Sequence, residues 1–196
     1  AGIRIDHYSN AKITENSISK NAQEGILIVE TATAEIQKNI IMENLRANIA
    51  FGGENSENTS IIENTIGYGR CEGIYIVKAG AAVIEKNDVY ENNYGIVIQN
   101  ASPKISKNSV YKNKSDGILI FEESTPEIIG NTIRENQGIG LYIREFVKGT
   151  YRDNQLHGNE IDLAMDKREQ ELSTIKFENE IKGTTIIPSR RCTIFQ

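Results

Sequence analysis

The sequence predicts an all-β fold, a parallel β-helix of about seven to eight coils, each about 23 residues long with three short strands. Three observations lead to this prediction. Asparagine and glycine recur in columns at that period, apolar and polar residues alternate over short runs, and isoleucine dominates the apolar positions. Alternation with a period of two is typical of strands, and a fixed period of this length is typical of repeat proteins.

Two asparagine columns and one glycine column keep step along the chain. Coils stacked about 4.8 Å apart place equivalent side chains over one another, so asparagines in register can bond along the stack. We expect the glycines to serve a bend that needs positive φ. The columns are Asn16, Asn39, Asn64, Asn87, Asn108, Asn131 and Asn154; then Asn21, Asn44, Gly69, Asn92, Asn113, Asn136 and Asn159; then Gly2, Gly25, Asn48, Gly73, Gly95, Gly117 and Gly140.

Each repeat holds three expected strands, for example 104–105, 109–111 and 118–120. Inward isoleucines should form apolar rows that no single coil could bury alone. Leucine-rich repeats have a similar period, but they need an L-x-x-L-x-L core and a helical or extended return segment, which this chain does not show. The predicted inward residues include Ile26, Ile28, Ile74, Ile76, Ile96, Ile98, Ile118 and Ile120.

We divide the chain into repeats over residues 1–164 and a degraded last coil with a C-terminal cap over residues 165–196. The charged run 165–172 is compatible with a helical turn or a loop. Asn179 stands 25 residues after Asn154 (179 − 154), which indicates an eighth coil. Residues 184–196 are expected to cover the open end of the solenoid. The chain begins in repeat register at Gly2, so we expect it to be part of a longer protein.

Composition restricts the partners. The net charge is −5 without a basic stripe, so nucleic acid is not expected as a partner. No apolar run approaches the roughly 18 residues of a membrane span. The two cysteines, Cys71 and Cys192, share no repeat position, so no disulfide framework is expected. An intracellular location is favoured, and a secreted one stays open.

The strand that follows the glycine column presents an outward apolar strip. Its first outward column is expected to end at Asp162 and its second at Ala164. Exposed apolar patches of several hundred Å² usually mark an interaction site. We expect a protein partner, a flanking domain or the chain's own tail on this strip, and carbohydrate is a further possibility through Tyr75 and Tyr142. The apolar strip consists of Leu27, Val29, Tyr75, Val77, Val97, Leu119, Phe121 and Tyr142.

No catalytic residue, metal site or cofactor is expected. A glycosidase needs two carboxylates about 5–10 Å apart. The two outward columns of the middle coils contain none, although Glu30, Glu122 and Glu145 follow the strip at the next turn. His7 and His157 lie about six coils apart and cannot form a pair. The longest coil exceeds its neighbours by about two residues, within 52–57, so no long loop is available to wall a cleft.

The motif I-x-x-N-x-V-x-x-x-N followed by G-I-x-I, as in Ile105–Asn113 and Gly117–Ile120, resembles the right-handed parallel β-helix repeat superfamily over about residues 2–164. Similar repeats occur in pectate lyases, alginate epimerases, a periplasmic copper-site maturation protein, F-box receptors and SHC-SH2-binding proteins. The short regular coils look most like the last two groups. The resemblance therefore implies a non-catalytic scaffold for protein recognition, with a carbohydrate-active enzyme or carbohydrate-binding module as the alternative.

Overall fold

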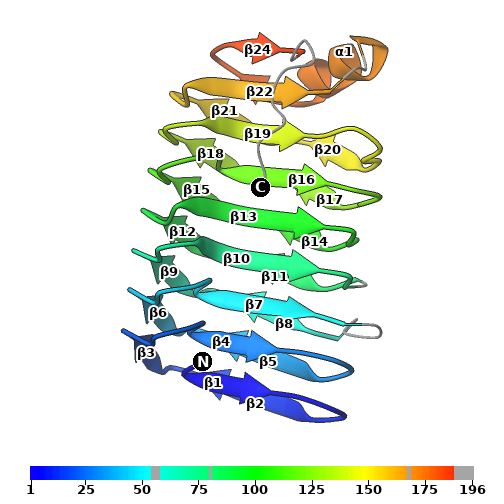
Figure 1. The fold of residues 1–196 in the computed structure, drawn as a ribbon. Helices are drawn as coiled ribbons and strands as arrows, with labels where there is room; N and C mark the ends of the chain where they lie inside the picture. Colours follow the sequence, from blue (N-terminus) through cyan, green and yellow to red (C-terminus); the bar gives the residue numbers. More distant parts are fainter. Residues whose placement is uncertain (54–57, 80, 167–168, 188–196) are drawn as a thin grey trace, which may run out of the picture.

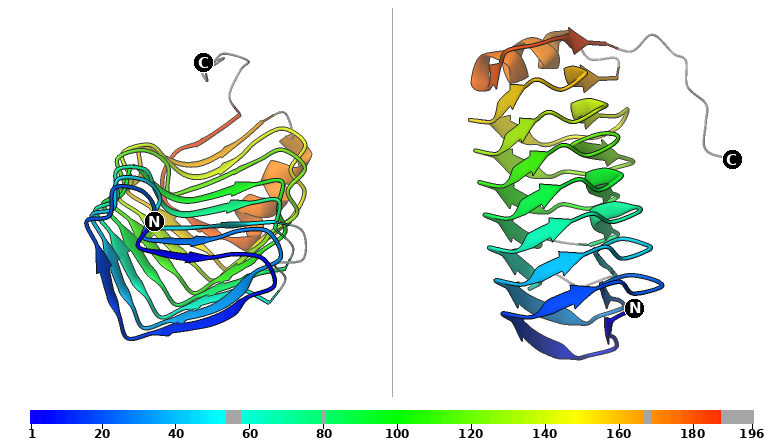
Figure 2. Two further views of the ribbon diagram at one scale, coloured as in Figure 1. Left: turned by 60° about the horizontal axis from the view of Figure 1, so that its bottom comes forward. Right: turned by 90° about the vertical axis from the view of Figure 1, so that its left-hand side faces the viewer.

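The computed structural model describes residues 1–53, 58–79, 81–166 and 169–187. The chain winds into a parallel β-helix whose coils stack along one axis, with the N-terminus at one end of the stack (Figure 1). Seen along the stack, each coil has three sides, and each side belongs to a different sheet (Figure 2). Every strand pairing is parallel. The predicted fold of about eight coils is confirmed.

Three sheets share the strands, and neighbours within a sheet come from consecutive coils. Sheet A has nine strands: β1 (Ile3–Ile5), β4 (Ile26–Ile28), β7 (Ile49–Gly52), β10 (Glu72–Val77), β13 (Tyr94–Gln99), β16 (Ile118–Phe121), β19 (Ile139–Ile143), β22 (Ile161–Met165) and β24 (Thr185–Ile186). Sheet B has seven: β2 (Asn10–Thr14), β5 (Thr33–Gln37), β8 (Ser60–Ile62), β11 (Val83–Glu85), β14 (Lys104–Ser106), β17 (Glu127–Ile129) and β20 (Thr150–Arg152). Sheet C has eight: β3 (Ser17–Ser19), β6 (Ile40–Met42), β9 (Thr65–Gly67), β12 (Asp88–Tyr90), β15 (Ser109–Tyr111), β18 (Thr132–Arg134), β21 (Gln155–His157) and β23 (Glu180–Ile181).

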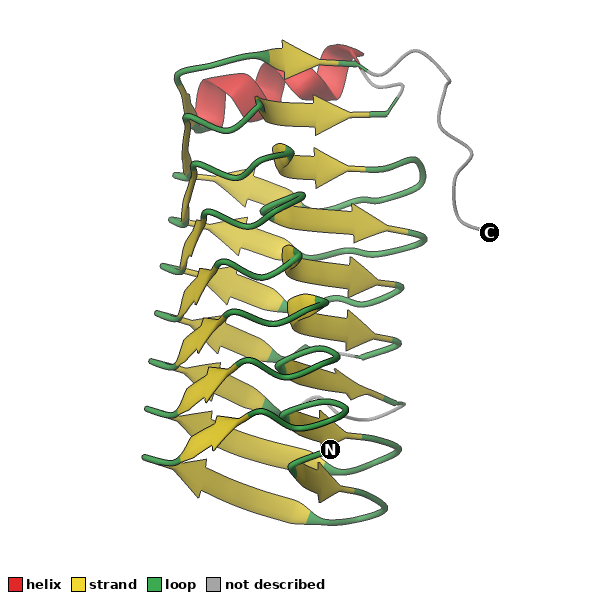
Figure 3. Cartoon of the chain, turned by 60° about the vertical axis from the view of Figure 1, so that its left-hand side comes forward, coloured by secondary structure: helices red, strands yellow, loops and turns green. Residues whose placement is uncertain are grey.

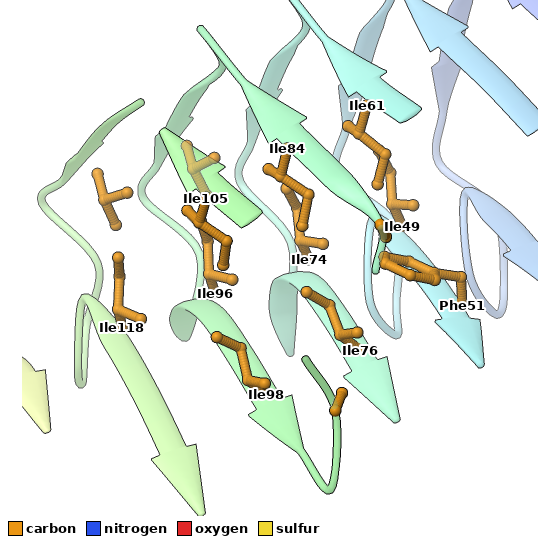
Figure 4. Packing of buried hydrophobic residues seen from close by; sticks show 14 of the residues in the cluster. Ile49, Phe51, Ile61, Ile74, Ile76, Ile84, Ile96, Ile98, Ile105 and Ile118 are labelled. Carbon is orange, nitrogen blue, oxygen red and sulfur yellow. The ribbon is translucent and has the colours of Figure 1, made fainter. Parts of the chain in front are cut away.

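Isoleucine rows fill the interior. Ile74 pairs with Ile96, which pairs with Ile118, and all three side chains are fully buried. Figure 4 shows these rows running from coil to coil. Burying one such side chain contributes about 1.5–3 kcal/mol, and each row needs the coils above and below it. The predicted core is confirmed.

The asparagine ladder also forms as predicted. Asn87 donates from its backbone N and from Nδ2 to Oδ1 of Asn108, both at 2.9 Å, and Nδ2 donates to the Ile61 carbonyl at 2.8 Å. The positive φ, however, falls on the residue before the ladder asparagine. Lys86 and Lys107 have φ values of 55° and 56°, and the asparagines themselves are not left-handed. The chain turns just before each asparagine, and the amide then holds the turn.

Glycine is needed in the glycine column for a reason other than the bend expected from the sequence. Gly95 and its equivalents do not have positive φ. A Cβ built on Gly95 would lie 2.3 Å from the Gly117 carbonyl oxygen and 3.0 Å from Nδ2 of Asn113. Glycine is therefore required because the ladder asparagine and the backbone of the next coil fill the space.

A helix closes the described C-terminal end. Helix α1 (Glu169–Glu178) follows β22 and contacts β20, so it stands where an eighth strand of sheet B would lie (Figure 3). Its Ile175 is 7% exposed and joins the core. Asn179 continues the ladder, accepting from Nδ2 of Asn154 at 2.8 Å, and β23 pairs with β21. The predicted eighth coil is present, and part of the charged run is helical. Most of the expected tail cap, residues 188–196, lies outside the described residues.

Candidate functional site

The outward side of sheet A is the candidate functional face. Tyr75, Val97, Leu119 and Tyr142 follow one another in register on β10, β13, β16 and β19. The expected end of this column is wrong, because Tyr142 pairs with Ala164 rather than with Asp162. Asp162 pairs by position with Gly140 and turns inward, where it is fully buried and accepts from Nδ2 of Asn159 at 2.8 Å.

The apolar strip is less open than the sequence suggests. Val97 and Leu119 are only 5% and 8% exposed. The other members are partly exposed: Leu27, Val29, Tyr75, Val77, Phe121 and Tyr142. Whether the chain's own tail covers the strip depends on residues 188–196, which lie outside the described residues. In the middle of the strip, two nearly buried side chains therefore lie between two partly exposed tyrosines.

A polar row connects three coils on this face. The Tyr75 hydroxyl donates to Oε1 of Gln99, and Nε2 of Gln99 donates to Oε1 of Glu122 at 2.6 Å. Gln99 pairs in register with Phe121, so the row crosses from β10 over β13 to the turn after β16. This arrangement places an amide and a carboxylate beside the first tyrosine.

A second polar group surrounds the other tyrosine. The Tyr142 hydroxyl donates to Oδ1 of Asp166 at 3.2 Å. Oδ2 of Asp166 accepts from the backbone N of Glu145 at 3.3 Å and lies 3.8 Å from Nε of Arg144. The Arg144 guanidinium also lies 6.0 Å from the centre of the Tyr142 ring. Tyr142 thus bonds a carboxylate directly, whereas Tyr75 is connected to one through Gln99.

The electrostatic environment of both tyrosines is negative. Burial raises the pKa of Tyr75, and the charges of Glu72 and Glu122 raise it further. Burial also raises the pKa of Tyr142, with a further contribution from Asp166 and an opposing one from Arg144. An electron-rich phenolate is disfavoured beside carboxylates, so both rings stay neutral well into alkaline pH.

Asp116 lies at the edge of this face, just before β16. Burial raises the pKa of its carboxyl group, although the hydrogen bond from the backbone N of Ile139, at 2.8 Å, acts in the opposite direction. Its charge also contributes to the raised pKa of Tyr142. Asp116 was not singled out from the sequence, because nothing in its repeat position distinguishes a half-buried acid from an exposed one.

Glu122 follows β16 and Glu145 follows β19 at equivalent positions, because Ile120 pairs with Ile143. At about 4.8 Å per coil, these two carboxylates are one coil apart along the axis. Asp166 follows β22 one register position earlier, level with Arg144, because Ile143 pairs with Met165. The sequence prediction included the two glutamates at the turn but missed Asp166, because the last coil was aligned two residues out of register. With the register corrected, Asp166 continues the second outward column of this face beside Tyr142.

Comparison with known proteins identifies the fold family. The family model described as the right-handed beta helix region matches residues 1–102 and 50–187, which together span nearly the whole chain. The chain belongs to the right-handed β-helix family. No curated protein matches this sequence. Among solved structures, the right-handed β-helix is similar to a double mutant of the periplasmic alginate epimerase AlgG, with a TM-score of 0.70 and 18% identity.

The structural match covers 92% of this chain and 48% of the epimerase chain, so this right-handed β-helix spans about half the length of the protein it resembles. At this identity the match shows the fold alone. Within the described residues there is no group of three or more His, Cys, Asp or Glu side chains arranged for a metal ion. In the same part of the chain, no helix is long and apolar enough to cross a membrane.

The two histidines do not meet. Nδ1 of His7 lies 3.4 Å from Oδ1 of Asp6 and 3.6 Å from Oε2 of Glu30, at the N-terminal end of the right-handed β-helix. His157 pairs in register with Arg134 on sheet C, near the other end. Neither histidine lies beside Tyr75 or Tyr142, so the candidate face must act through carboxylates, amides, arginine and aromatic rings.

Proposed function

We propose that the outer face of sheet A binds a glycan chain non-covalently. The observation that carries this proposal is the pair of partly exposed tyrosines, Tyr75 and Tyr142, each with a hydrogen-bonded set of polar side chains beside its ring. Sugar rings present apolar C–H faces and polar hydroxyl edges. An aromatic ring with amide and carboxylate groups next to it matches both surfaces.

The spacing of the tyrosines suits an oligosaccharide rather than a single sugar. Tyr75 on β10 and Tyr142 on β19 are three strands apart in sheet A, which is about 14 Å along the stack. The side chains between them in the same column are Val97 and Leu119, which are apolar and nearly buried. A chain lying along the stack could contact both rings and reach Gln99 between them.

The likeness to an alginate epimerase supports a carbohydrate ligand more than the protein partner expected from the sequence. It supports only the class of ligand, since fold similarity does not establish function. That epimerase is periplasmic, so a secreted location is compatible with this proposal, and the comparisons do not support the intracellular location expected from the cysteines.

The proposal is tested by titrating a panel of oligosaccharides into the protein and its variants by calorimetry. Tyr75→Ala and Tyr142→Ala should each weaken binding about tenfold, because truncating a central aromatic contact typically costs more than about 1 kcal/mol. Tyr68→Ala is the matched control, since Tyr68 is 47% exposed and packs against Tyr90 of sheet C. Equal losses from all three variants, or binding that none of them alters, would contradict the proposal.

A carbohydrate-active enzyme is the second candidate, because Glu122 and Glu145 stand at equivalent positions of consecutive coils, and Asp166 accepts from the backbone N of Glu145. Retaining glycosidases place two carboxyl groups about 5–5.5 Å apart, close to the rise of one coil. If the face is catalytic, Glu122→Gln, Glu145→Gln or Asp166→Asn should abolish cleavage or epimerisation of a bound oligosaccharide while leaving its affinity measurable. Chromatography of oligosaccharides after long incubation would show whether any product forms.

Protein recognition remains a proposal for the N-terminal part of the strip, where Leu27 and Val29 are partly exposed on a coil that precedes both tyrosines. A double variant, Leu27→Asp with Val29→Asp, should remove binding of a purified protein partner and leave glycan binding unchanged. Loss of folding in this variant would mean that the two side chains support the structure instead.

A further inference from the structure

We infer that the glycan bound by sheet A carries no carboxylate groups, and that the face selects against polyuronates. This inference rests on the proposed glycan-binding function and adds the class of sugar. It comes from the charges that surround the two tyrosines rather than from the tyrosines themselves.

Carboxylates lie on both sides of the aromatic positions. Glu72 and Asp116 stand at the start of sheet A strands or just before them, and Glu122, Glu145 and Asp166 follow the ends of later strands. Glu72 and Glu122 both act on Tyr75, while Asp116 and Asp166 both act on Tyr142. A ligand stacked on either ring therefore lies between acids.

Positive charge on the same face is smaller and is partly neutralised. Arg144 lies 3.8 Å from Oδ2 of Asp166, so its charge is already matched by a carboxylate. Lys78 is exposed and follows Val77 in the turn after β10. Neither cation is placed between the two tyrosines, where a row of sugar carboxylates would have to lie.

The hydrogen bonds place carboxylates against both rings. The Tyr142 hydroxyl donates to Asp166 at 3.2 Å, and Gln99 joins the Tyr75 hydroxyl to Glu122. Burial is the first cause that raises the pKa of each tyrosine, and the charges of these carboxylates raise it further. The field that disfavours a phenolate also disfavours a carboxylate on a sugar stacked over the ring. Alginate is a polyuronate with a carboxylate on each sugar, so the ligand of the structurally similar epimerase is the class that this face should reject.

The same carboxylates do not exclude a cationic amino-sugar chain, because a carboxylate that accepts hydrogen bonds keeps its negative charge. Glu122 accepts a hydrogen bond from Gln99, and Asp166 accepts from the Tyr142 hydroxyl and a backbone N. These groups are arranged as hydrogen-bond partners within the face, and their remaining acceptor capacity suits sugar hydroxyls.

The experiment compares three hexasaccharide classes on the intact protein by calorimetry: uncharged β-linked glucose, xylose and mannose chains, oligogalacturonate and oligomannuronate, and oligoglucosamine. At about 0.15 M salt we expect at least one uncharged chain to bind about tenfold or more tighter than either uronate. Glu72→Gln should raise uronate affinity severalfold and leave the uncharged ligand within about twofold, because it removes one repulsive charge beside Tyr75.

Glu85→Gln is the matched control, since Glu85 lies on sheet B and bonds Lys107 at 3.0 Å. Tighter binding of a uronate than of every uncharged chain would overturn the inference and leave the glycan-binding proposal intact. Binding of no glycan at all would overturn both. A Glu72→Gln variant that gains no uronate affinity would show that the acids do not set the selection. Circular dichroism spectra check that both variants remain folded.

Discussion

The side chain of Asn48 occupies the space that Gly69 leaves empty in the asparagine ladder. Nδ2 of Asn44 donates to Oδ1 of Asn48 at 2.7 Å, and Nδ2 of Asn48 donates to Oδ1 of Asn92 at 2.9 Å. The backbone N of Gly69 donates to the same Asn92 oxygen at 2.9 Å. Asparagine and glycine have therefore exchanged columns at these two positions. Asn48 stands in the glycine column and supplies the side-chain amide that Gly69 lacks in the second asparagine column.

This exchange predicts that the two positions are strongly coupled. Asn48→Gly should destabilise the protein by about 1–3 kcal/mol, because it removes the 2.7 Å acceptor of Asn44 Nδ2 and one of the two donors to Asn92 Oδ1. Gly69→Asn should cost a similar amount, since a Cβ at Gly69 would lie 2.9 Å from Nδ2 of Asn48. The double variant rebuilds the ordinary pattern and should return to within about 1 kcal/mol of the parent.

Urea unfolding of the four proteins measures this coupling. The double variant, which carries Asn48→Gly and Gly69→Asn together, should have a higher free energy of unfolding than either single variant. Additive losses in the double variant would mean that Asn48 is held by contacts other than the ladder.

The rows of the β-helix could be predicted because each position repeats its neighbours. An inward isoleucine such as Ile96 meets another isoleucine above and below, so one correct alignment fixes the environment of the whole row. The prediction went wrong where a repeat lacks its marker. In the last coil Asp162 stands in the glycine column. Without a glycine to mark this position, the predicted alignment matched Tyr142 with Asp162, two residues before its actual partner Ala164.

The candidate site was harder to predict for a different reason. Its polar groups belong to turns and strand ends, where side-chain direction depends on φ and on local hydrogen bonds rather than on the repeat. The contact from Tyr142 to Asp166 joins positions 24 residues apart, and it forms because Asp166 lies one coil beyond Arg144, in register with it. The two-residue shift of the predicted last coil hid this neighbour, and the bond from the backbone N of Glu145 to Asp166 depends on the turn rather than on the repeat.

Left-handed turns give a second prediction. Gly130 has a φ of 66° and open space around a Cβ, so Gly130→Ala should destabilise by about 0.5–1 kcal/mol through backbone strain alone. Glu91 occupies the equivalent left-handed turn of the second ladder column, with a φ of 51°. Glu91→Gly should stabilise by about 0.5–1 kcal/mol for the opposite reason.

Thermal unfolding compares these variants with Glu91→Ala, which removes the side chain and keeps the strain. Glu91→Ala should be close to neutral. If Glu91→Ala and Glu91→Gly shift the unfolding temperature equally, the loss of the side chain rather than φ determines the effect.

A third prediction concerns Asp116. Burial raises the pKa of its carboxyl group above the ordinary value of 3.8, so the folded state holds this proton more tightly than the unfolded state. The contribution of the protonated group to stability is complete below the ordinary pKa and is lost as pH rises through the folded pKa. Asp116→Asn keeps an oxygen for the backbone N of Ile139 but cannot ionise, so it should gain stability relative to the parent as pH rises.

The measurement is the free energy of unfolding of the parent and of Asp116→Asn from about pH 3 to pH 7. The difference between the two proteins should grow in favour of the variant over the acid range and then level off. A difference that is constant with pH would show that the folded structure does not disfavour the charged carboxylate.

The last prediction follows from a second polar residue in the glycine column. Asp162 repeats the position of Asn48: it accepts from Nδ2 of Asn159 at 2.8 Å, as Asn48 accepts from Nδ2 of Asn44 at 2.7 Å. Within the described structure Oδ2 of Asp162 is buried without a hydrogen-bond donor, whereas the Nδ2 of Asn48 donates to the Gly67 carbonyl at 2.9 Å. An amide at position 162 can use a neighbouring carbonyl in the same way.

Asp162→Asn should therefore stabilise the protein at neutral pH by about 1–3 kcal/mol, the cost of leaving a buried polar group unsatisfied. The matched variant Asn48→Asp should destabilise by at least as much, because it turns a carboxylate oxygen toward the Gly67 carbonyl and Oδ1 of Asn92, which are both acceptors. Urea unfolding at pH 7 gives both values. Destabilisation by Asp162→Asn would mean that Oδ2 of Asp162 accepts a hydrogen bond from a donor outside the described residues. The parallel between positions 48 and 162 would then be wrong.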